Sequence, residues 1–225
     1  TAGLCSMGAK VIPLGVVPTP AVAYLTRYYK ADAGVVISAS HNPCEYNGIK
    51  FFNSDGYKLS DGIEHEIESY ILGEKAIEEL PTHGKVGYVS ANHNAVEDYV
   101  AFAVSTIDCR LDGMKIAVDC ANGASYETAF KALNKLGANV EAIHNTPDGV
   151  NINHMCGSTH MESLQAYVTS IGADIGIAFD GDADRMLAVD ENGNLIDGDQ
   201  IMAACAKFMR DNGTLKQNTL VATVM

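Results

Sequence analysis

A short apolar run at residues 175–179 leads directly into a segment that carries a carboxylate at every second position. Asp180, Asp182 and Asp184 are followed at once by Arg185. The apolar run predicts a buried strand, and in an open α/β sheet ligands gather beyond the C-terminal ends of the strands. The sequence therefore predicts an α/β fold whose sheet ends in an acidic, ligand-binding loop.

The chain around this loop alternates predicted strands with predicted helices. Gly137 stands where a helix commonly ends, residues 159–162 fit a capping box, and Asp197 or Asp199 fits the start of a last helix. A hairpin turn is expected at residues 191–193. Apolar patterning places strands at 115–119, 140–143, 175–179, 186–189 and 195–196, and helices at 125–136, 159–171 and 197–213. This alternation favours a mainly parallel sheet.

The first hundred residues show a less regular version of the same pattern. Residues 11–17 predict a strand, and Thr19 followed by Pro20 predicts the N-cap of a helix over residues 21–30. The β-branched run at residues 34–37 is typical of a strand buried on both faces. Further helices are expected at 61–72 and 96–107, with a boundary at 108–113. We therefore predict two consecutive three-layer α/β units with mainly parallel mixed sheets.

The composition excludes several classes of partner. Lys and Arg total 15 against 28 Asp and Glu, which gives a net charge of −13. Nucleic acid and anionic membranes attract positive surfaces, so we expect neither as a partner. No apolar run reaches the roughly 18 residues of a membrane span. The six cysteines form no CxxC pair or zinc-like cluster, so we expect free thiols in a reducing, cytoplasmic compartment.

The acidic loop has the chemistry of a divalent-cation site. Gly181 is expected to turn the three carboxylates toward one point, and Mg²⁺ prefers hard oxygen ligands of this kind. Arg185 adds a fixed charge suited to a phosphate oxygen. An EF-hand is disfavoured because Arg185 stands where that loop needs glycine. A plain polar surface turn remains open on these residues alone.

A second motif, Ser40-His41-Asn42-Pro43, follows the predicted strand at 34–37. Adjacent Ser and His cannot easily meet as nucleophile and base, and no Gly-x-Ser-x-Gly elbow is present, so a serine hydrolase is disfavoured. A phosphorylated Ser40 would instead supply an oxygen ligand to a cation in the acidic loop. His41 is placed to position or exchange a proton. Lys50 is placed to neutralise a phosphate, or to act as acid or base if its pKa is lowered.

Three longer strings carry these motifs. They are GVVISASHNPCEYNGIKFFNSDGYKL at residues 34–59, NTPDGVNINHMCGSTHME at 145–162 and GIAFDGDADRMLAVDENGNLIDGDQIM at 176–202. The chain resembles the α-D-phosphohexomutases over essentially its whole length, and among them it is most similar to the bacterial phosphoglucosamine mutases.

The resemblance implies that Ser40 is the phosphoserine of the resting enzyme. It implies Mg²⁺ held by Asp180, Asp182, Asp184 and a phosphate oxygen on Ser40. Glucosamine 6-phosphate would be converted through a 1,6-bisphosphate into glucosamine 1-phosphate, an amino-sugar precursor of peptidoglycan. By the same resemblance, the catalytic set is Ser40 with His41 and Lys50 close to the transferred group, and Arg185 binds phosphate.

The resemblance also implies how the chain is divided. Residues 1–108 correspond to the C-terminal part of domain 1, residues 109–215 to domain 2, and residues 216–225 to the start of domain 3. The family has four domains, and its later sugar- and phosphate-binding loops have no counterpart here, so we expect little mutase activity from this chain alone. A phosphosugar substrate is implied, and a homodimer is common in the family. Phosphomannomutase or phosphoglucomutase activity, and a non-catalytic divalent-metal-binding module, remain alternatives.

Overall fold

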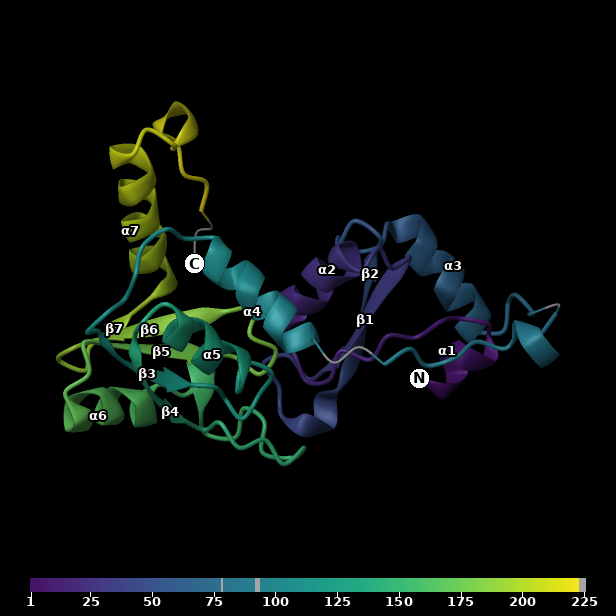
Figure 1. Cartoon of the computed structure of the whole chain (residues 1–225), viewed down its shortest axis with the longest axis horizontal. Coiled ribbons are helices and arrows are strands. Elements are labelled where there is room, and N and C mark those ends of the chain that lie inside the picture. The colour runs from purple at the N-terminus through teal and green to yellow at the C-terminus, as the bar shows by residue number, and fades with distance from the viewer. Residues whose placement is uncertain (78, 92–93, 223–225) are drawn as a thin grey trace.

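The computed structural model describes residues 1–77, 79–91 and 94–222. Two α/β units lie side by side, with helix α4 (Ala95–Ser105) between them (Figure 1). The first unit contains α1 (Ala2–Ser6), α2 (Thr19–Tyr28), β1 (Ala33–Ser38), β2 (Gly48–Asn53) and α3 (Asp61–Ile71). The second contains β3 (Lys115–Asp119), α5 (Thr128–Lys135), β4 (Asn139–Ile143), α6 (Glu162–Ile171), β5 (Ile175–Phe179), β6 (Met186–Asp190), β7 (Leu195–Ile196) and α7 (Gly198–Asp211). Both units are mixed α/β, as predicted, but the two described strands of the first unit pair antiparallel, where a mainly parallel sheet was expected.

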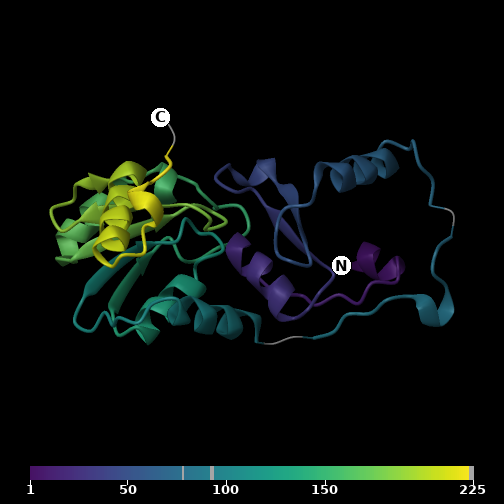
Figure 2. The same cartoon turned by 90° about the horizontal axis from the view of Figure 1, so that it is seen from above.

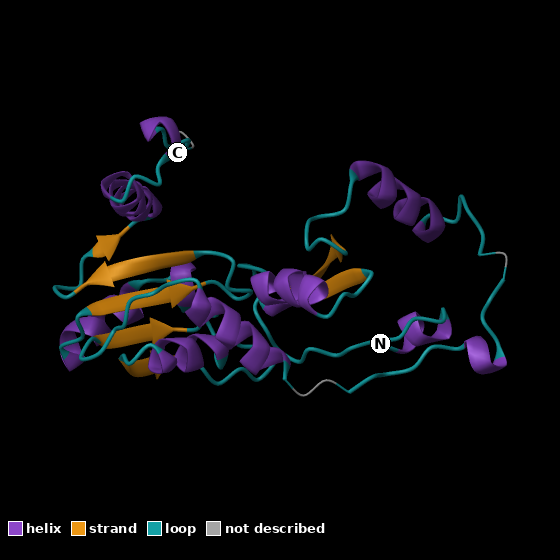
Figure 3. Cartoon of the chain, turned by 45° about the horizontal axis from the view of Figure 1, so that its top comes forward, coloured by secondary structure: helices purple, strands orange, loops and turns teal. Residues whose placement is uncertain are grey.

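The second unit is built on a five-stranded sheet with the order β4-β3-β5-β6-β7. Strands β4, β3 and β5 are parallel to one another. Strand β6 runs antiparallel to β5, and β7 pairs antiparallel with β6 through the predicted hairpin. Figure 3 shows this stack of strands beside the two strands of the first unit. The C-terminal ends of β3, β4 and β5 therefore meet along one edge of the sheet. The acidic loop starts at the end of β5, on that edge.

Side-chain alternation along β3 distributes the core over two faces of the sheet. Ile116 and Val118 pack on one face, against a cluster that includes Leu133 of α5. Ala117 points to the other face and packs with the fully buried Leu164 of α6. Helices α5 and α6 thus cover opposite faces, which gives the predicted three layers.

The first unit is held by one apolar cluster between α2 and the strand pair β1–β2. Val22 and Leu25 of α2 pack on Val36, and β1 runs antiparallel to β2. Val35 and Ile37 point the other way and are 38% and 74% exposed. The prediction that this strand is buried on both faces is wrong, because within the described part of the chain a helix covers only the Val36 face.

Three predicted details of the first unit need correction. Residues 11–17 form no regular strand: Val11 makes one isolated bridge to Val89, and Pro13 lacks the N–H that a strand ladder needs. Helix α2 starts at Thr19 itself, with Pro18 as N-cap. The Thr19 side chain does not cap α2 and has a different partner, described below.

One helix of the second unit also differs from the prediction. Helix α6 begins one turn later than expected, with Met161 as N-cap and no side-chain cap, because residues 157–159 form a separate 3-10 turn. Helix α7 does have a capping box, in which Asp197 accepts from the Gln200 amide and the Gln200 side chain accepts from the Asp197 amide. The apolar run at residues 220–225 adds no strand within the described range, because residues 220–222 have no regular secondary structure, and residues 223–225 lie outside that range.

Helix α4 joins the two units. Ala95 belongs to the apolar cluster of the first unit, and Glu97 pairs with Lys131 and Lys135 of α5 in the second. Seen from above, the two units keep this side-by-side arrangement (Figure 2). Among the described residues, none of the helices has the length and apolar character needed to cross a membrane.

Candidate active site

The serine motif forms a tight turn directly after β1. Ser38 Oγ accepts a hydrogen bond from the Ser40 amide at 2.9 Å, and the Asn42 amide donates to the Ala39 carbonyl at 3.0 Å. Ser40 has φ 56°, in the left-handed region that non-glycine residues seldom occupy. Such backbone conformations cost on the order of 1–3 kcal/mol and persist where the surrounding structure enforces them. The turn therefore needs external support to keep its geometry.

The acidic loop connects β5 to β6 and gathers its three carboxylates. Each of Asp180, Asp182 and Asp184 has a carboxylate oxygen that lies within 4.8 Å of an oxygen of the other two. Asp180 and Asp182 are buried, at 1% and 2% exposure. The sequence prediction that these side chains converge is supported by this geometry, and such an all-oxygen set suits a hard divalent cation.

The expected reason for Gly181 in this loop is wrong. The left-handed residue is Ala183, with φ 54°, and Gly181 does not have a positive φ. Gly181 is instead required for close approach, because a Cβ there would lie 2.5 Å from the Ser40 carbonyl oxygen. The missing side chain lets the serine turn and the acidic loop touch.

The two motifs meet through side chains from distant parts of the sequence. Ser40 Oγ donates to Asp182 Oδ1 at 3.3 Å, and Lys50 Nζ donates to Asp182 Oδ2 at 2.6 Å and to Asp184 Oδ2 at 3.5 Å. Thr19 Oγ1 also donates to Asp182 Oδ2 at 2.7 Å. Asp182 is thus the residue of the acidic loop to which Ser40, Lys50 and Thr19 of the first unit all bind.

Arg185 and His41 complete the surroundings of Ser40. Arg185 Nη2 lies 3.2 Å from Ser40 Oγ, 2.9 Å from Asp180 Oδ2 and 2.6 Å from His41 Nδ1. A guanidinium group can only donate, so His41 Nδ1 accepts and the ring proton of this neutral histidine is on Nε2. The structure therefore brings all seven predicted site residues together around Ser40 and Asp182.

Burial and charge shift the acidity of three of these groups. Burial would raise the pKa of Asp182, but hydrogen bonds from Lys50 and Thr19 and the Lys50 charge outweigh it and lower that pKa. For Asp180, burial dominates and raises the pKa. Burial would lower the pKa of Lys50, but the Asp182 carboxylate outweighs burial and raises it. The Asp182 carboxylate therefore favours the charged form of Lys50 over a neutral base.

Sequence reasoning missed two contacts of this site. Thr19 was predicted as a helix cap, yet both its hydroxyl and its amide bind Asp182, the amide donating to the Asp182 carbonyl at 2.9 Å. Asn153, in the string at 145–162, donates to backbone carbonyls of the serine turn. A short polar residue beside a helix start or in a loop gives no signal of a partner more than 100 residues away.

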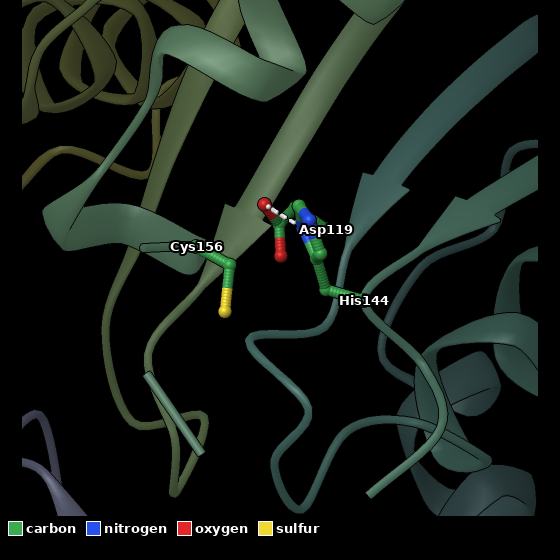
Figure 4. A group of neighbouring side chains, drawn as sticks. All are labelled: Asp119, His144 and Cys156. Carbon is green, nitrogen blue, oxygen red and sulfur yellow. Dashed lines mark hydrogen bonds and ion pairs between the residues drawn. The ribbon is translucent and has the colours of Figure 1, made fainter. Parts of the chain in front are cut away.

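A second cluster lies close by, at the ends of β3 and β4 (Figure 4). Atoms of Asp119, His144 and Cys156 lie within 4.8 Å of one another, although their sequence spacing gave no sign of it. Asp119 is fully buried and accepts hydrogen bonds from the Ala121 amide, the Gly157 amide and His144 Nδ1, at 2.8, 3.0 and 2.9 Å. These donors already satisfy the carboxylate. Burial raises the pKa of Cys156 to about 11, which keeps a neutral thiol. We interpret Asp119 as a structural centre that joins three loops.

Comparison with known proteins gives consistent matches. Residues 1–78 match the family described as phosphoglucomutase/phosphomannomutase, alpha/beta/alpha domain I, and residues 95–193 match its domain II. Curated phosphoglucosamine mutases of Ruminiclostridium cellulolyticum and Acetivibrio thermocellus are 61% and 62% identical over 99% and 100% of this chain. The chain spans about half the length of these relatives, 50% in each case. The crystal structure of a phosphoglucomutase/phosphomannomutase family protein from Burkholderia thailandensis matches with a TM-score of 0.76 and 28% identity, over 93% of this chain and 46% of that one.

Proposed function

The chain belongs to the phosphoglucomutase/phosphomannomutase family, and we propose that it carries the phosphoserine and metal-binding half of a phosphoglucosamine mutase active site. The proposed reaction interconverts glucosamine 6-phosphate and glucosamine 1-phosphate through a 1,6-bisphosphate. The observation that carries the proposal is the contact of Ser40 Oγ with both Asp182 and Arg185, at 3.3 and 3.2 Å.

The proposed step moves one phosphoryl group. The bond between phosphorus and Ser40 Oγ breaks, a bond from phosphorus to a sugar hydroxyl forms, and the proton of that hydroxyl ends on Ser40 Oγ. Arg185 is placed to bind an oxygen of the phosphoryl group, and Lys50 offsets the negative charge that gathers beside Asp182. His41 presents Nε2–H as a hydrogen-bond donor, with its ring held by Arg185.

Asp180, Asp182 and Asp184 would hold Mg²⁺ together with a phosphate oxygen on Ser40. The residues fit this ion, because the three convergent carboxylates supply only hard oxygen atoms. When bound, the ion would withdraw negative charge from the transferring phosphoryl group. The buried positions of Asp180 and Asp182 limit competition from water for these ligands.

Specificity for the glucosamine phosphates is proposed from the curated relatives, which are named phosphoglucosamine mutases. Their identity to this chain is about twice that of the Burkholderia family protein. We also propose the division at residues 1–108, 109–215 and 216–225, a homodimer, and a cytoplasmic location, which suits the six free cysteines.

The test is phosphorylation of Ser40. The chain is incubated with Mg²⁺ and glucose 1,6-bisphosphate as phosphoryl donor, and the modified peptide is mapped by mass. We expect one phosphoryl group on the Ser40 peptide, none in Ser40→Ala, and a strong reduction in Asp182→Asn. A chain that binds Mg²⁺ but never accepts phosphate would be the non-catalytic metal-binding module. Turnover of glucosamine, glucose and mannose phosphates by the full-length protein then separates the mutase alternatives.

A further inference from the structure

Asn153 reaches from the second unit to the backbone of the serine turn. Its side-chain nitrogen donates to the Ser40 carbonyl at 2.9 Å and to the Asn42 carbonyl at 2.8 Å. Both acceptors are carbonyl oxygens, so the atom that faces them must be Nδ2, and both of its hydrogens are used. One side chain thus fixes the turn on both sides of His41.

Asn153 is itself buried, and its backbone is hydrogen-bonded to a neighbouring loop. It is 6% exposed, and its φ of 57° lies in the left-handed region that Asn tolerates better than most residues. Its amide donates to the Ala121 carbonyl at 2.9 Å, and the Ala121 amide is in turn bound by Asp119. The Asp119 centre drawn in Figure 4 therefore supports the loop from which Asn153 extends.

The contact lies directly against the acidic loop. A Cβ on Gly181 would meet both the Ser40 carbonyl, at 2.5 Å, and Asn153 Nδ2, at 2.7 Å. Asn153, the backbone of Ser40 and the backbone of Gly181 are therefore packed against one another without spare space. Any rotation of the turn that moved Ser40 Oγ away from Asp182 would have to break the Asn153 hydrogen bonds.

We propose that Asn153 is a positioning residue that fixes the left-handed serine turn so that Ser40 Oγ stays beside Asp182 during phosphoryl transfer. The expected effect of Asn153 on phosphoryl transfer rests on the proposed function. The hydrogen bonds by which Asn153 fixes the backbone of the turn do not depend on that function. Asn153 does not touch the reacting atoms. Its effect comes through the backbone, and misplacing a reacting group by about 1 Å costs on the order of 100-fold in rate.

Two variants isolate the side-chain donor. Asn153→Asp keeps the size and tolerates the left-handed backbone, but it presents no donor to the two carbonyls. Asn153→Gly removes the side chain and keeps the backbone freedom. The matched control is Asn139→Asp, at an exposed position in β4 of the same unit.

Two readouts are taken for each variant of the full chain. The first is hydrogen exchange of the peptide at residues 38–46, compared with the peptide that holds β3. The second is the rate of Ser40 phosphorylation at saturating glucose 1,6-bisphosphate and Mg²⁺. We expect faster exchange at 38–46 alone, and a transfer rate at least about ten-fold below that of the wild type and of Asn139→Asp.

The outcomes separate the two proposals. Unchanged hydrogen exchange at residues 38–46 would overturn the positioning role. Exchange that becomes faster in β3 to the same extent as at residues 38–46 would also overturn it, because that result indicates a general loss of structure. Faster exchange of the turn with a wild-type transfer rate would also overturn it. If the wild-type chain accepts no phosphate, the proposed function fails, and exchange alone decides whether Asn153 holds the turn.

Discussion

Substitution of Gly181 by alanine is the sharpest test of how the site is assembled. The added Cβ would lie 2.5 Å from the Ser40 carbonyl oxygen, 2.7 Å from Asn153 Nδ2 and 2.7 Å from Ile152 Cδ1. Real Cβ atoms essentially never approach other atoms closer than 3.0 Å. The serine turn and the acidic loop must therefore separate by about 0.5 Å or more, which is the whole tolerance of a productive catalytic geometry.

The expected cost appears in both stability and transfer. Overpacking of this kind destabilises by about 1–3 kcal/mol, and each kcal/mol lowers the thermal midpoint of a chain of this size by about 2–4 °C. A displacement between about 0.5 and 1 Å is expected to slow Ser40 phosphorylation by roughly 10- to 100-fold. The direct contact of Ser40 Oγ with Asp182, already 3.3 Å long, is the interaction that lengthens.

The assay combines thermal unfolding with mass-resolved phosphorylation of the Ser40 peptide. Gly62→Ala in α3 is the matched control, because a Cβ there has no neighbour within 4 Å. The control should transfer at the wild-type rate and keep or slightly raise the midpoint, since alanine favours a helix by up to about 1 kcal/mol. A Gly181→Ala chain with wild-type stability and wild-type transfer would refute the close-approach explanation.

Three further predictions concern other parts of the chain. Leu164→Ala should lower the free energy of unfolding by about 2–5 kcal/mol in urea, because Leu164 is fully buried; a loss below 1 kcal/mol would contradict this core assignment. Cys205 should react with a thiol reagent in the native state and Cys156 only after unfolding, because Cys156 is buried with a pKa of about 11; equal native rates would disprove this. Hydrogen bonds from two lysines of α5, with Lys131 contributing most, lower the pKa of Glu97 to about 2. The ionised Glu97 side chain therefore stabilises the fold fully above pH about 4.5, and this stabilisation is lost as the pH falls toward 2. The difference in thermal midpoint between wild type and Glu97→Gln should therefore shrink between pH 7 and pH 3, and a constant difference would exclude the linkage.

Local sequence patterns were sufficient to predict a strand where a single apolar run made up the whole segment. The strands at 115–119 and 175–179 were predicted residue for residue, because short apolar runs bounded by polar turns have few alternatives in an α/β chain. Residues 11–17 have a similar apolar content but contain Pro13 and Gly15, which weaken a strand, and only one bridge forms. Thr19 shows that local patterns do not predict long-range contacts. Its hydroxyl binds the buried carboxylate of Asp182, which is 163 positions away in the sequence.

The sequence was sufficient to predict which side chains gather at the candidate site, but only some of the contacts that hold them in place. Ser40 and the acidic loop were paired because one motif supplies a hydroxyl and the other supplies cation ligands. The role of Gly181 could not be predicted, since a close approach between two loops is a property of the folded chain. Asn153 was hidden for the same reason, because its acceptors are backbone carbonyls that every sequence contains.

The charges around Ser40 explain why a divalent cation belongs to the proposed chemistry. Three carboxylates face two cationic side chains, Lys50 and Arg185, and His41 Nδ1 accepts a hydrogen bond from Arg185, so the site has a formal charge near −1. Phosphorylation of Ser40 would add about −1.5 to −2 at neutral pH. Without further positive charge, the phosphoryl group would be repelled by Asp182, the same residue that Ser40 Oγ contacts. A divalent cation bound to the acidic loop would restore the balance, and phosphate on Ser40 and metal on that loop would then stabilise each other.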